Sequence, residues 1–571
     1  MRLSAFALTA ALVRTASSAV LENFQVTQPA ILPSGVKQCT VEVLRRDFAS
    51  SYGHAEVVEL IPPTDCGPLG SWSAITLNLT VTSNGTQYDR LGVFTFQNVE
   101  IWRTSTPEPT RGDGIRWTYV KDVTKYLPLF EKPGTFIFQL DNIIQEGLDG
   151  VYSTVVGATY YASSEKHPTA AKADLIIPLS TLANDTGNDA AVPPGFSLNV
   201  TLPTNTIKVF AELYASGNSQ EEFWYLNAPN DYLEELPDGT TYGQGPFREV
   251  RLLVDGRLSG VAFPYAVLFT GGIIPSFWRP IAAYGALDLP TYFIDVTPFA
   301  SLLADGNPHN FTIDVASAEN DHAILGNWFV SGALYVVLDT SPKPTTGGIT
   351  VYEADPYASS SVSRTDTGDV AFTVSAERTI HIEATVISGS GETTTVVWTQ
   401  NLSYENKQTF DANATVQTMR QTASGTTKST HNGKSALSDV FEYPLDIDFT
   451  YENENLTSWT SSLNHTYDRA LLPSPLQIEN KIHNEQGVVG FFEIRTGGNL
   501  GNGTSNNSFT YGDVLGNTYS RTVNAALNNI TFDEESGSLA GDIDKELQAD
   551  RMAGGGDEGI QARLPGRGEV S

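Results

Sequence analysis

One pattern occurs twice in this chain of 571 residues, and it constrains the fold more than any other feature. Trp-Arg at 102–103 is followed by Asp-Val-Thr at 122–124, and a weaker echo has Trp-Arg at 278–279 followed by Asp-Val-Thr at 295–297. After each Asp-Val-Thr come an apolar stretch, a turn with Gly or Asn and an alternating strand. Two copies of one pattern predict two domains with the same fold.

Alternating apolar and polar residues predict the fold class. Short alternating runs bounded by turn residues occur at 41–44, 74–79 and 135–138 and continue beyond 195. No long segment with the 3.6-residue period of an amphipathic helix competes with them. The sequence therefore predicts an all-β protein made of antiparallel sandwiches or jelly rolls.

Changes in composition divide the chain into segments. The first residues have the basic start, apolar core and small residues of a secretory signal peptide. A stretch rich in Ala, Asp and Pro predicts a linker between two domains. The polar end of the chain predicts a disordered tail. The predicted boundaries are 1–19 for the signal peptide, 20–162 for the first β domain, 163–194 for the linker, 195–340 for the second β domain, 341–532 for a third β-rich region and 533–571 for the tail.

The charge and the absence of long apolar runs limit the partners. A formal net charge of −31 disfavours nucleic acid and anionic membrane surfaces, because a polyanion would be repelled. No run of about 20 apolar residues follows the leader, so no membrane-spanning helix is expected. The leader and many Asn-x-Ser/Thr sequons predict a secreted, extracellular glycoprotein.

The chain has two cysteines, Cys39 and Cys66. In an oxidising compartment a Cys39–Cys66 disulfide is the expected state, and a nucleophilic or metal-binding cysteine is the alternative. The eight histidines are scattered without metal-ligand spacing, so neither a metal nor another cofactor is expected. Catalysis, if present, would depend on carboxylates and arginines carried by strands and loops.

Two acidic motifs are candidates for that chemistry. Asp89-Arg90 opens an alternating strand, where the two residues form either a weak surface pair or part of a catalytic site. Glu221 and Glu222 precede the aromatic pair at 224–225. Because neighbouring side chains on a strand point to opposite faces, only one of the two glutamates can join an aromatic-lined site. The aromatic rings belong either to the core or to a surface that stacks on a sugar.

Two arginine motifs also have two interpretations. Arg248-Glu249 alternates faces, and a solvated strand face is the simpler interpretation. Trp278-Arg279 is either a cation–π packing element or a clamp on a carbonyl oxygen.

Several of these motifs together resemble the peptide-N4-(N-acetyl-β-glucosaminyl)asparagine amidases. The resemblance is strong to the amidase A type of plants and fungi and fainter to the bacterial amidase F type, and it covers residues 20–339. It implies two eight-stranded antiparallel jelly rolls packed side by side, with the site in the cleft between them. The motifs include Y-D-R-L-G-V at 88–93, E-I-W-R-T-S-T-P-E-P-T at 100–110, W-T-Y-V-K-D-V-T at 117–124, E-E-F-W-Y-L-N at 221–227 and F-W-R-P at 277–280.

The resemblance also implies roles for single residues. The essential acid of the bacterial enzymes follows an aromatic residue and precedes an arginine, which places it at Asp89. Glu222, or else Glu249, would supply the second acid. Asp141 falls where the bacterial enzymes carry Glu, and Arg279 falls near an arginine that binds chitobiose. The remaining substrate-binding candidates are Arg90 and the tryptophans Trp102, Trp224 and Trp278, as stacking platforms for GlcNAc.

The function implied by the resemblance is that of a secreted glycoamidase. It would hydrolyse the β-amide between an asparagine side chain and the first GlcNAc of N-glycopeptides and N-glycoproteins, recognising the chitobiose core without an obligate protein partner. A non-catalytic, lectin-like module on the same fold and an endoglycosidase are the alternatives. Asp89 distinguishes the glycoamidase from the lectin-like module, since a sugar-binding protein needs aromatic residues but no essential carboxylate.

Overall fold

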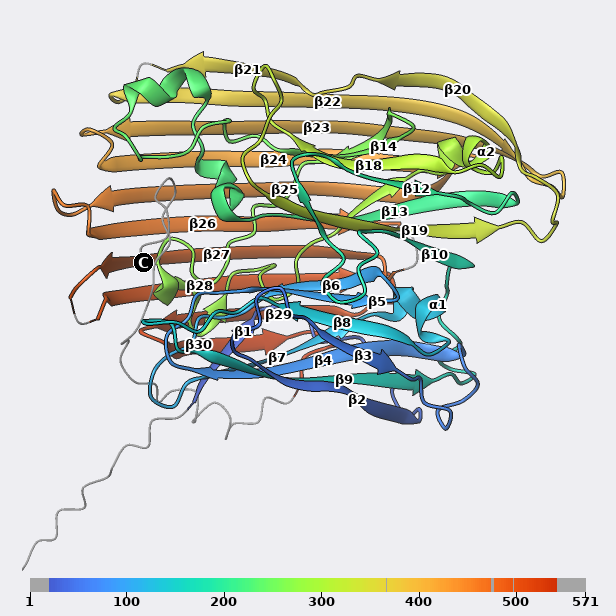
Figure 1. The fold of residues 1–571 in the computed structure, drawn as a ribbon, viewed down its shortest axis with the longest axis horizontal. Coiled ribbons are helices and arrows are strands. Elements are labelled where there is room, and N and C mark those ends of the chain that lie inside the picture. Colours follow the sequence, from blue (N-terminus) through green and yellow to red (C-terminus); the bar gives the residue numbers. More distant parts are fainter. Residues whose placement is uncertain (1–19, 366, 474–476, 497, 542–571) are drawn as a thin grey trace, which may run out of the picture.

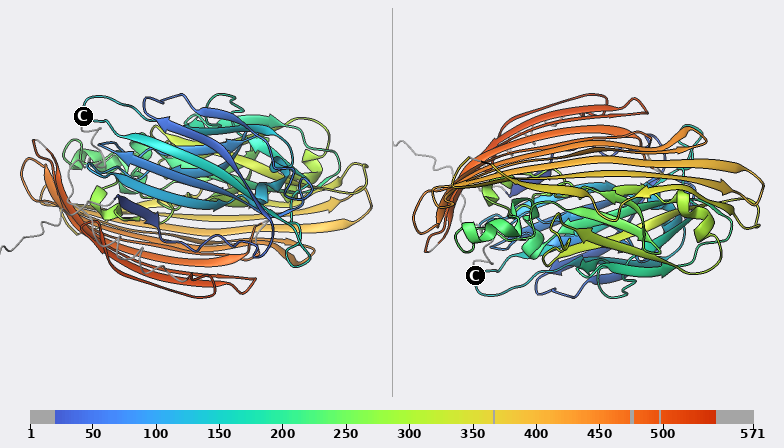
Figure 2. Two further views of the ribbon diagram at one scale, coloured as in Figure 1. Left: turned by 90° about the horizontal axis from the view of Figure 1, so that it is seen from below. Right: turned by 90° about the horizontal axis from the view of Figure 1, so that it is seen from above.

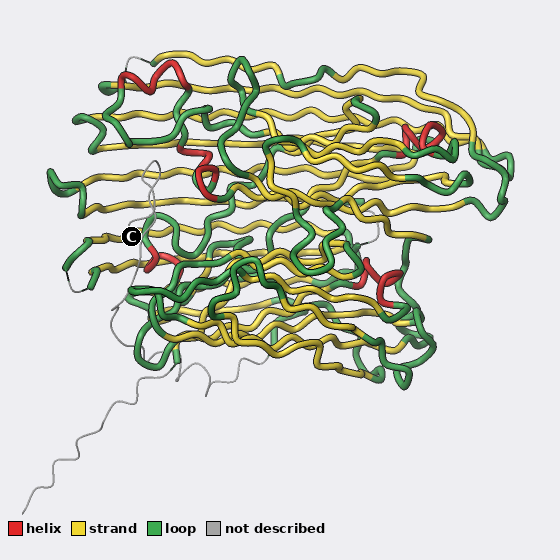
Figure 3. The backbone as a smooth tube through the Cα atoms, viewed as in Figure 1, coloured by secondary structure: helices red, strands yellow, loops and turns green. Residues whose placement is uncertain are grey.

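The structure is a computed structural model that describes residues 20–365, 367–473, 477–496 and 498–541. Strands dominate it and helices are few and short (Figures 1 and 3). Two sandwiches lie against one broad sheet, and their buried side chains form a nearly continuous core. The predicted signal peptide at 1–19 lies outside the described residues, as does the predicted tail from residue 542 onward. The all-β class predicted from the alternation is confirmed.

The first sandwich pairs its strands in two sheets. One sheet has the order β1-β7-β4-β9-β2, and the other has the order β3-β8-β5-β6. Without β1, which is added at one edge, the strands β7-β4-β9-β2 and β3-β8-β5-β6 have the connectivity of a jelly roll, in which the first strand, β2, pairs with the last, β9. The strands are β1 (Leu21–Gln25), β2 (Gln38–Phe48), β3 (Glu56–Leu60), β4 (Trp72–Asn84), β5 (Leu91–Phe96), β6 (Val99–Ser105), β7 (Ile115–Asp122), β8 (Gly134–Leu140) and β9 (Val151–Ala162).

The second sandwich repeats this connectivity. Its sheets have the orders β10-β19-β13-β17 and β12-β18-β14-β15, which match β2-β9-β4-β7 and β3-β8-β5-β6 strand for strand. The fold repeat predicted from the sequence is therefore present as two jelly rolls. The strands are β10 (Leu175–Leu179), β11 (Ala190–Val192), β12 (Phe196–Val200), β13 (Thr206–Gly217), β14 (Glu249–Val254), β15 (Arg257–Ala262), β17 (Tyr292–Asp295), β18 (His309–Ala316) and β19 (Trp328–Leu338).

The repeated Asp-Val-Thr forms the same turn in both copies. In the first copy, Oδ1 of Asp122 accepts from the amide of Thr124 at 2.8 Å. In the second, Oδ1 of Asp295 accepts from the amide of Thr297 at 2.9 Å. An Asp side chain that accepts from the amide two residues later stabilises a turn of this kind at the end of a strand. Short helices follow each turn, namely the 3-10 turn Thr124–Tyr126 with α1 (Leu127–Phe130), and the 3-10 turn Thr297–Phe299 with α2 (Ala300–Leu303).

The broad sheet contains eleven strands, all antiparallel to their neighbours. It covers one side of the molecule (Figure 2). Its strands alternate buried and exposed residues, as along β28, so one face packs inward and the other meets solvent. The strands are β20 (Thr346–Ala354), β21 (Ser359–Arg364), β22 (Val370–Ile387), β23 (Thr393–Asp411), β24 (Val416–His431), β25 (Lys434–Tyr451), β26 (Ser458–Leu471), β27 (Asn480–Glu493), β28 (Leu500–Asp513), β29 (Thr518–Ala526) and β30 (Asn529–Ser536).

The strand positions differ from two predicted boundaries. The stretch 163–194 contains β10 and β11, which both pair with β19 and belong to the second sandwich. The apolar run at 175–179 is short and lies among linker-like residues, which hid it. β30 continues past the predicted start of the tail at 533, where Asp533 pairs with Arg521 of β29.

Two further features connect the parts. The two-residue strand β16 (Ile281–Ala282) comes from the second domain but pairs in parallel with β1 of the first. The structure contains the Cys39–Cys66 disulfide, with the two Cα atoms 5.9 Å apart. None of the helices described here is long and apolar enough to cross a bilayer.

Candidate active site

The side chains of Asp89 and Glu108 converge on Gly271. Asp89 lies between β4 and β5, and Glu108 lies between β6 and β7. A methyl group built on the Cα of Gly271 would stand 2.8 Å from Oδ1 of Asp89 and 2.6 Å from Oε1 of Glu108. The two acids are only 5% and 1% exposed. Two buried carboxylates of the first domain thus meet the second domain where only glycine fits without displacing them.

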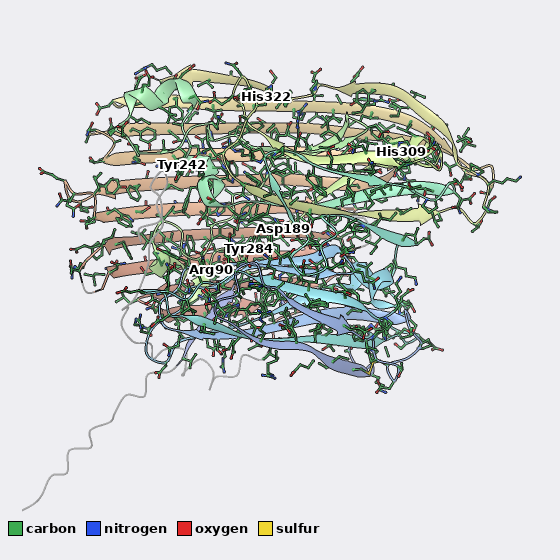
Figure 4. The ribbon with its side chains drawn as sticks, viewed as in Figure 1. Arg90, Asp189, Tyr242, Tyr284, His309 and His322 are labelled. Carbon is green, nitrogen blue, oxygen red and sulfur yellow. A yellow bond between two sulfur atoms is a disulfide. The ribbon has the colours of Figure 1, made fainter. Side chains whose placement is uncertain are left out.

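Strand pairing explains why these two connections meet. β5 and β6 are antiparallel neighbours, with Leu91 opposite Ser105. The pairing continues one step further, because the amide of Arg90 donates to Oγ1 of Thr106 at 2.8 Å and the amide of Thr106 donates to the carbonyl of Arg90 at 2.9 Å. The two acids consequently flank one end of this strand pair. Arg90 lies at the junction of the first sandwich with the rest of the molecule (Figure 4).

Two arginines accompany the acids. Nη2 of Arg279 lies 3.7 Å from Oε2 of Glu108 and donates to the carbonyl oxygens of Glu108 and Pro109 at 3.1 and 3.3 Å. Arg90 is half-buried, and its Nη2 donates to Oε1 of Gln87 at 2.7 Å. Arg279 therefore brings positive charge from the second domain to the acids of the first.

Tyr152 of β9 is a further neighbour. Its hydroxyl donates to the carbonyl of Tyr88 at 2.7 Å. Burial raises the pKa of this hydroxyl above its usual value, and the charges of Arg90, Glu108 and Asp89 also act on it. The tyrosine therefore stays protonated and lies in the electric field of the site.

Glu222 of the second domain directly precedes a residue that packs next to Gly271. It is 7% exposed and follows the 3-10 turn Ser219–Glu221. A ring carbon of the next residue, Phe223, lies 3.4 Å from a methyl group built on Gly272. The segment at 222–223 therefore packs on the turn that carries Gly271.

Its neighbour Glu221 has a structural role. Arg248 donates to both oxygens of Glu221 at 2.5 and 2.7 Å, and the indole of Trp328 donates to Oε2 at 2.7 Å. The expectation that only one of the two glutamates joins the site agrees with this placement. The reason given for it was wrong, because the segment forms two 3-10 turns, Ser219–Glu221 and Trp224–Leu226, and not a strand.

The gathered groups define the available chemistry. Carboxyl groups can take and give protons, and a guanidinium can stabilise an oxyanion in a site shielded from water. Among the residues that the structure describes, no group of three or more His, Cys, Asp and Glu side chains is arranged to hold a metal ion.

Comparison with known proteins identifies the family. The model of the family described as Peptide N-acetyl-beta-D-glucosaminyl asparaginase amidase A matches residues 29–355, and that of the PNGase_A C-terminal domain matches residues 371–445. The peptide-N4-(N-acetyl-beta-glucosaminyl)asparagine amidase A of Prunus dulcis is 34% identical over 417 residues, which are 70% of this chain and 71% of that relative.

The chain belongs to the amidase A family. This membership confirms the resemblance seen in the motifs. A crystal structure of a peptide-N(4)-(N-acetyl-β-D-glucosaminyl) asparagine amidase aligns with 53% of this chain and 97% of its own, at 12% identity and a TM-score of 0.33. The jelly-roll assignment of this amidase A family member rests on its own strand order.

The three tryptophans expected to stack on GlcNAc are buried, which favours the alternative that their rings belong to the core. Trp102 is 0% exposed, stacks on Phe94 and donates to the carbonyl of Leu287 at 3.0 Å. Trp224 and Trp278 are 3% and 1% exposed. Rings buried to this extent present no face to a sugar. In this amidase A family member they are core residues.

Glu249 and Asp141 lie outside the convergent group. Glu249 is bonded to Arg378 of β22, with Nε donating at 2.8 Å, so it joins the second sandwich to the broad sheet. The oxygens of Asp141 accept from the amide of Gly53 at 3.0 Å and from Nε2 of Gln139 at 2.9 Å. These contacts favour structural roles for both acids, and the roles in catalysis or substrate binding expected of them from the sequence stay predictions.

Sequence reasoning missed Glu108 and Tyr152. Glu108 lies inside the motif at 100–110, and it is the only acid of that motif that follows the strand rather than lying within it. That position was a usable signal. Tyr152 is one of several tyrosines in an alternating strand, and nothing in its neighbours in sequence marks it.

Proposed function

We propose that this amidase A family member hydrolyses the β-amide bond between an asparagine side chain and the first N-acetylglucosamine of N-glycopeptides and N-glycoproteins. Water adds to the amide carbon and the carbon–nitrogen bond breaks. The peptide keeps an aspartate, and the glycan leaves as a glycosylamine that decays to ammonia and free glycan. The convergence of Asp89 and Glu108 on Gly271, in a chain of this family, carries the proposal.

Amide hydrolysis needs a base for water and an acid for the leaving nitrogen. Asp89, as a carboxylate, accepts the proton of the attacking water. Glu108 delivers a proton to the nitrogen of the glycosylamine. Environments that give two neighbouring carboxyl groups different protonation states are a common way to divide these roles. One buried pair thus supplies both proton transfers.

Arg279 and Glu222 complete the proposed site. The guanidinium of Arg279, next to Glu108, stabilises the negative charge that develops on the amide oxygen. Glu222 hydrogen-bonds hydroxyl groups of the chitobiose from the second domain. Arg90, at the half-buried edge, contacts the sugar or the peptide.

Secretion is part of the proposal. The Cys39–Cys66 disulfide is typical of oxidising compartments. The asparagines of the sequons, from Asn78 to Asn529, are exposed or half-buried, so a glycan can be attached at each. A secreted glycoamidase would encounter secreted N-glycoproteins, which are among the proposed substrates.

Mass spectrometry of a short glycopeptide incubated with the protein in H2¹⁸O tests the proposal. We expect a peptide in which Asp replaces the glycosylated Asn and its new carboxyl group carries one ¹⁸O. Asp89→Asn is expected to abolish the product.

Two results would overturn the glycoamidase. A peptide that retains one GlcNAc would show an endoglycosidase. An intact glycopeptide that stays bound to the protein would show a lectin-like module.

A further inference from the structure

The connection between β15 and β17, residues 263–291, carries Gly271 and Arg279 to the site; we call it the bridging segment. It is fastened to the first sandwich at several points. Oγ1 of Thr270 donates to the carbonyl of Thr106 at 2.7 Å, and Nδ2 of Asn23 donates to the carbonyl of Trp278 at 2.8 Å. On this side the segment is held next to the two acids.

The opposite side of the bridging segment is fastened to the broad sheet. The indole Nε1 of Trp459, on β26, donates to the carbonyl of Ile273 at 3.2 Å. The hydroxyl of Tyr265 is 3.1 Å from Nδ1 of His465, also on β26. Oε1 of Gln486 on β27 accepts from the amide of Tyr284 at 3.2 Å. The sheet therefore contacts this one connection near its start, in its middle and towards its end.

The contact at Ile273 supports an unfavourable backbone conformation. Ile273 has a φ of +64° and is 1% exposed. A β-branched residue in the left-handed region is a true outlier, which costs on the order of 1–3 kcal/mol and persists only where the surroundings impose it. It stands two residues after Gly271, so a relaxation of Ile273 would move the glycine that meets Asp89 and Glu108.

Glycines on the sheet let it approach the bridging segment closely. A methyl group built on Gly503 of β28 would stand 2.8 Å from the carbonyl oxygen of Ser276. One built on Gly490 of β27 would stand 2.8 Å from a ring carbon of Phe277. The 3-10 turn Pro275–Trp278 therefore rests on glycine backbone of the sheet, with its own backbone against Gly503 and the ring of Phe277 against Gly490.

We propose that the broad sheet is the positioning element of the site and that Trp459 is its central positioning residue. Trp459 holds Ile273 in its left-handed conformation and thereby fixes Gly271 against the carboxylates of Asp89 and Glu108. Arg279 directly follows the 3-10 turn Pro275–Trp278, so its position depends on the same contacts with the sheet. This inference rests on the proposed glycoamidase function. Its structural part, the conformation of the backbone around Gly271 and Ile273, can be tested without any measurement of activity.

The first test compares Trp459→Phe with Trp72→Phe. Trp72 is a matched control because it is also a buried tryptophan whose indole donates to a backbone carbonyl, that of Cys66 at 3.1 Å, within the first sandwich. Hydrogen exchange of the peptide at 269–278 is expected to rise at least tenfold in Trp459→Phe and to stay unchanged in Trp72→Phe. Unchanged exchange in both variants would overturn the inference, whatever the activity.

Kinetics on the glycopeptide give the second readout. We expect kcat to fall about ten- to a hundredfold in Trp459→Phe with little change in KM, because the reacting groups lose alignment while the glycan contacts remain. An equal loss in Trp72→Phe would mean a general effect on stability and would overturn the positioning role. Wild-type protein without any Asp product would contradict the proposed function and leave the exchange result to be judged separately.

A second pair of variants covers the case in which Trp459→Phe does not fold. Gly503→Ala adds one methyl group against Ser276, whereas Gly512→Ala, on the same strand, meets nothing within 4 Å. We expect Gly503→Ala to lower kcat at least tenfold while the protein still folds, with a lowered unfolding midpoint because backbone must shift, and Gly512→Ala to behave as wild type. Equal kcat values for the two alanine variants would count against positioning by the sheet.

Discussion

The carboxylate of Glu249 on β14 is bonded to the guanidinium of Arg378 on β22, and both side chains are 1% exposed. Arg378 also donates to the carbonyl of Asp355 at 2.6 Å. The pair joins the second jelly roll to the broad sheet in a place that water does not reach.

Removing one partner of this pair leaves a charge buried without its counterion. We therefore expect Arg378→Met to lower the free energy of unfolding by about 3–5 kcal/mol, measured by urea denaturation. The double variant Glu249→Gln, Arg378→Met should recover much of the loss. Arg45→Met breaks a solvent-exposed pair with Glu42 and serves as the control, with little change expected because solvent screens such a pair. A small loss in Arg378→Met would contradict a joining role.

The two convergent acids predict matched losses of activity. Asp89→Asn and Glu108→Gln each remove one proton-transfer group, and kcat on a glycopeptide should fall about 10²- to 10⁴-fold. Asp141→Asn is the control, since Asp141 is engaged by Gly53 and Gln139. If Asp141→Asn lost as much activity at unchanged stability, the assignment of the site would be wrong.

Gly271 predicts a loss without the removal of any functional group. In Gly271→Ala the new methyl group would stand 2.6 and 2.8 Å from the carboxylates of Glu108 and Asp89, so they must move. We expect kcat to fall at least tenfold while the thermal midpoint changes by only a few degrees. Gly348→Ala, which meets nothing within 4 Å, should keep wild-type activity in the same assay. Full activity of Gly271→Ala would show that the acids do not act at this point.

Buried His465 predicts an effect of acid on stability. Burial lowers the pKa of this imidazole to about 3, from an ordinary value of 6.5. The unfolded chain binds a proton here that the folded chain does not, so stability falls as the pH drops from about 6.5 to 3. In His465→Phe, which retains the ring that stacks on Tyr265, unfolding midpoints should depend less steeply on pH in this window. An unchanged pH dependence in His465→Phe would contradict this assignment.

The sequence predicted those parts of the fold that depend on neighbours along the chain. Asp-Val-Thr closes a turn within three residues, so its two copies revealed the repeat. β10 was missed because five apolar residues inside a polar stretch give a weak signal. The ion pair of Glu249 was not predicted because its partner, Arg378, lies 129 residues away. Glu108 was overlooked since only the folded chain brings it beside Asp89, and burial of the three tryptophans arises from packing between distant strands.

The pairing of β16 with β1 has a mechanical consequence. Ile281 and Ala282 belong to the second jelly roll by chain order, yet they complete the first domain's sheet opposite Phe24 and Gln25. Backbone hydrogen bonds thus join the two jelly rolls, and these bonds would have to break before the two domains could move apart. Backbone pairing therefore holds the segment that carries Gly271 and Arg279 in register with the domain that carries Asp89 and Glu108.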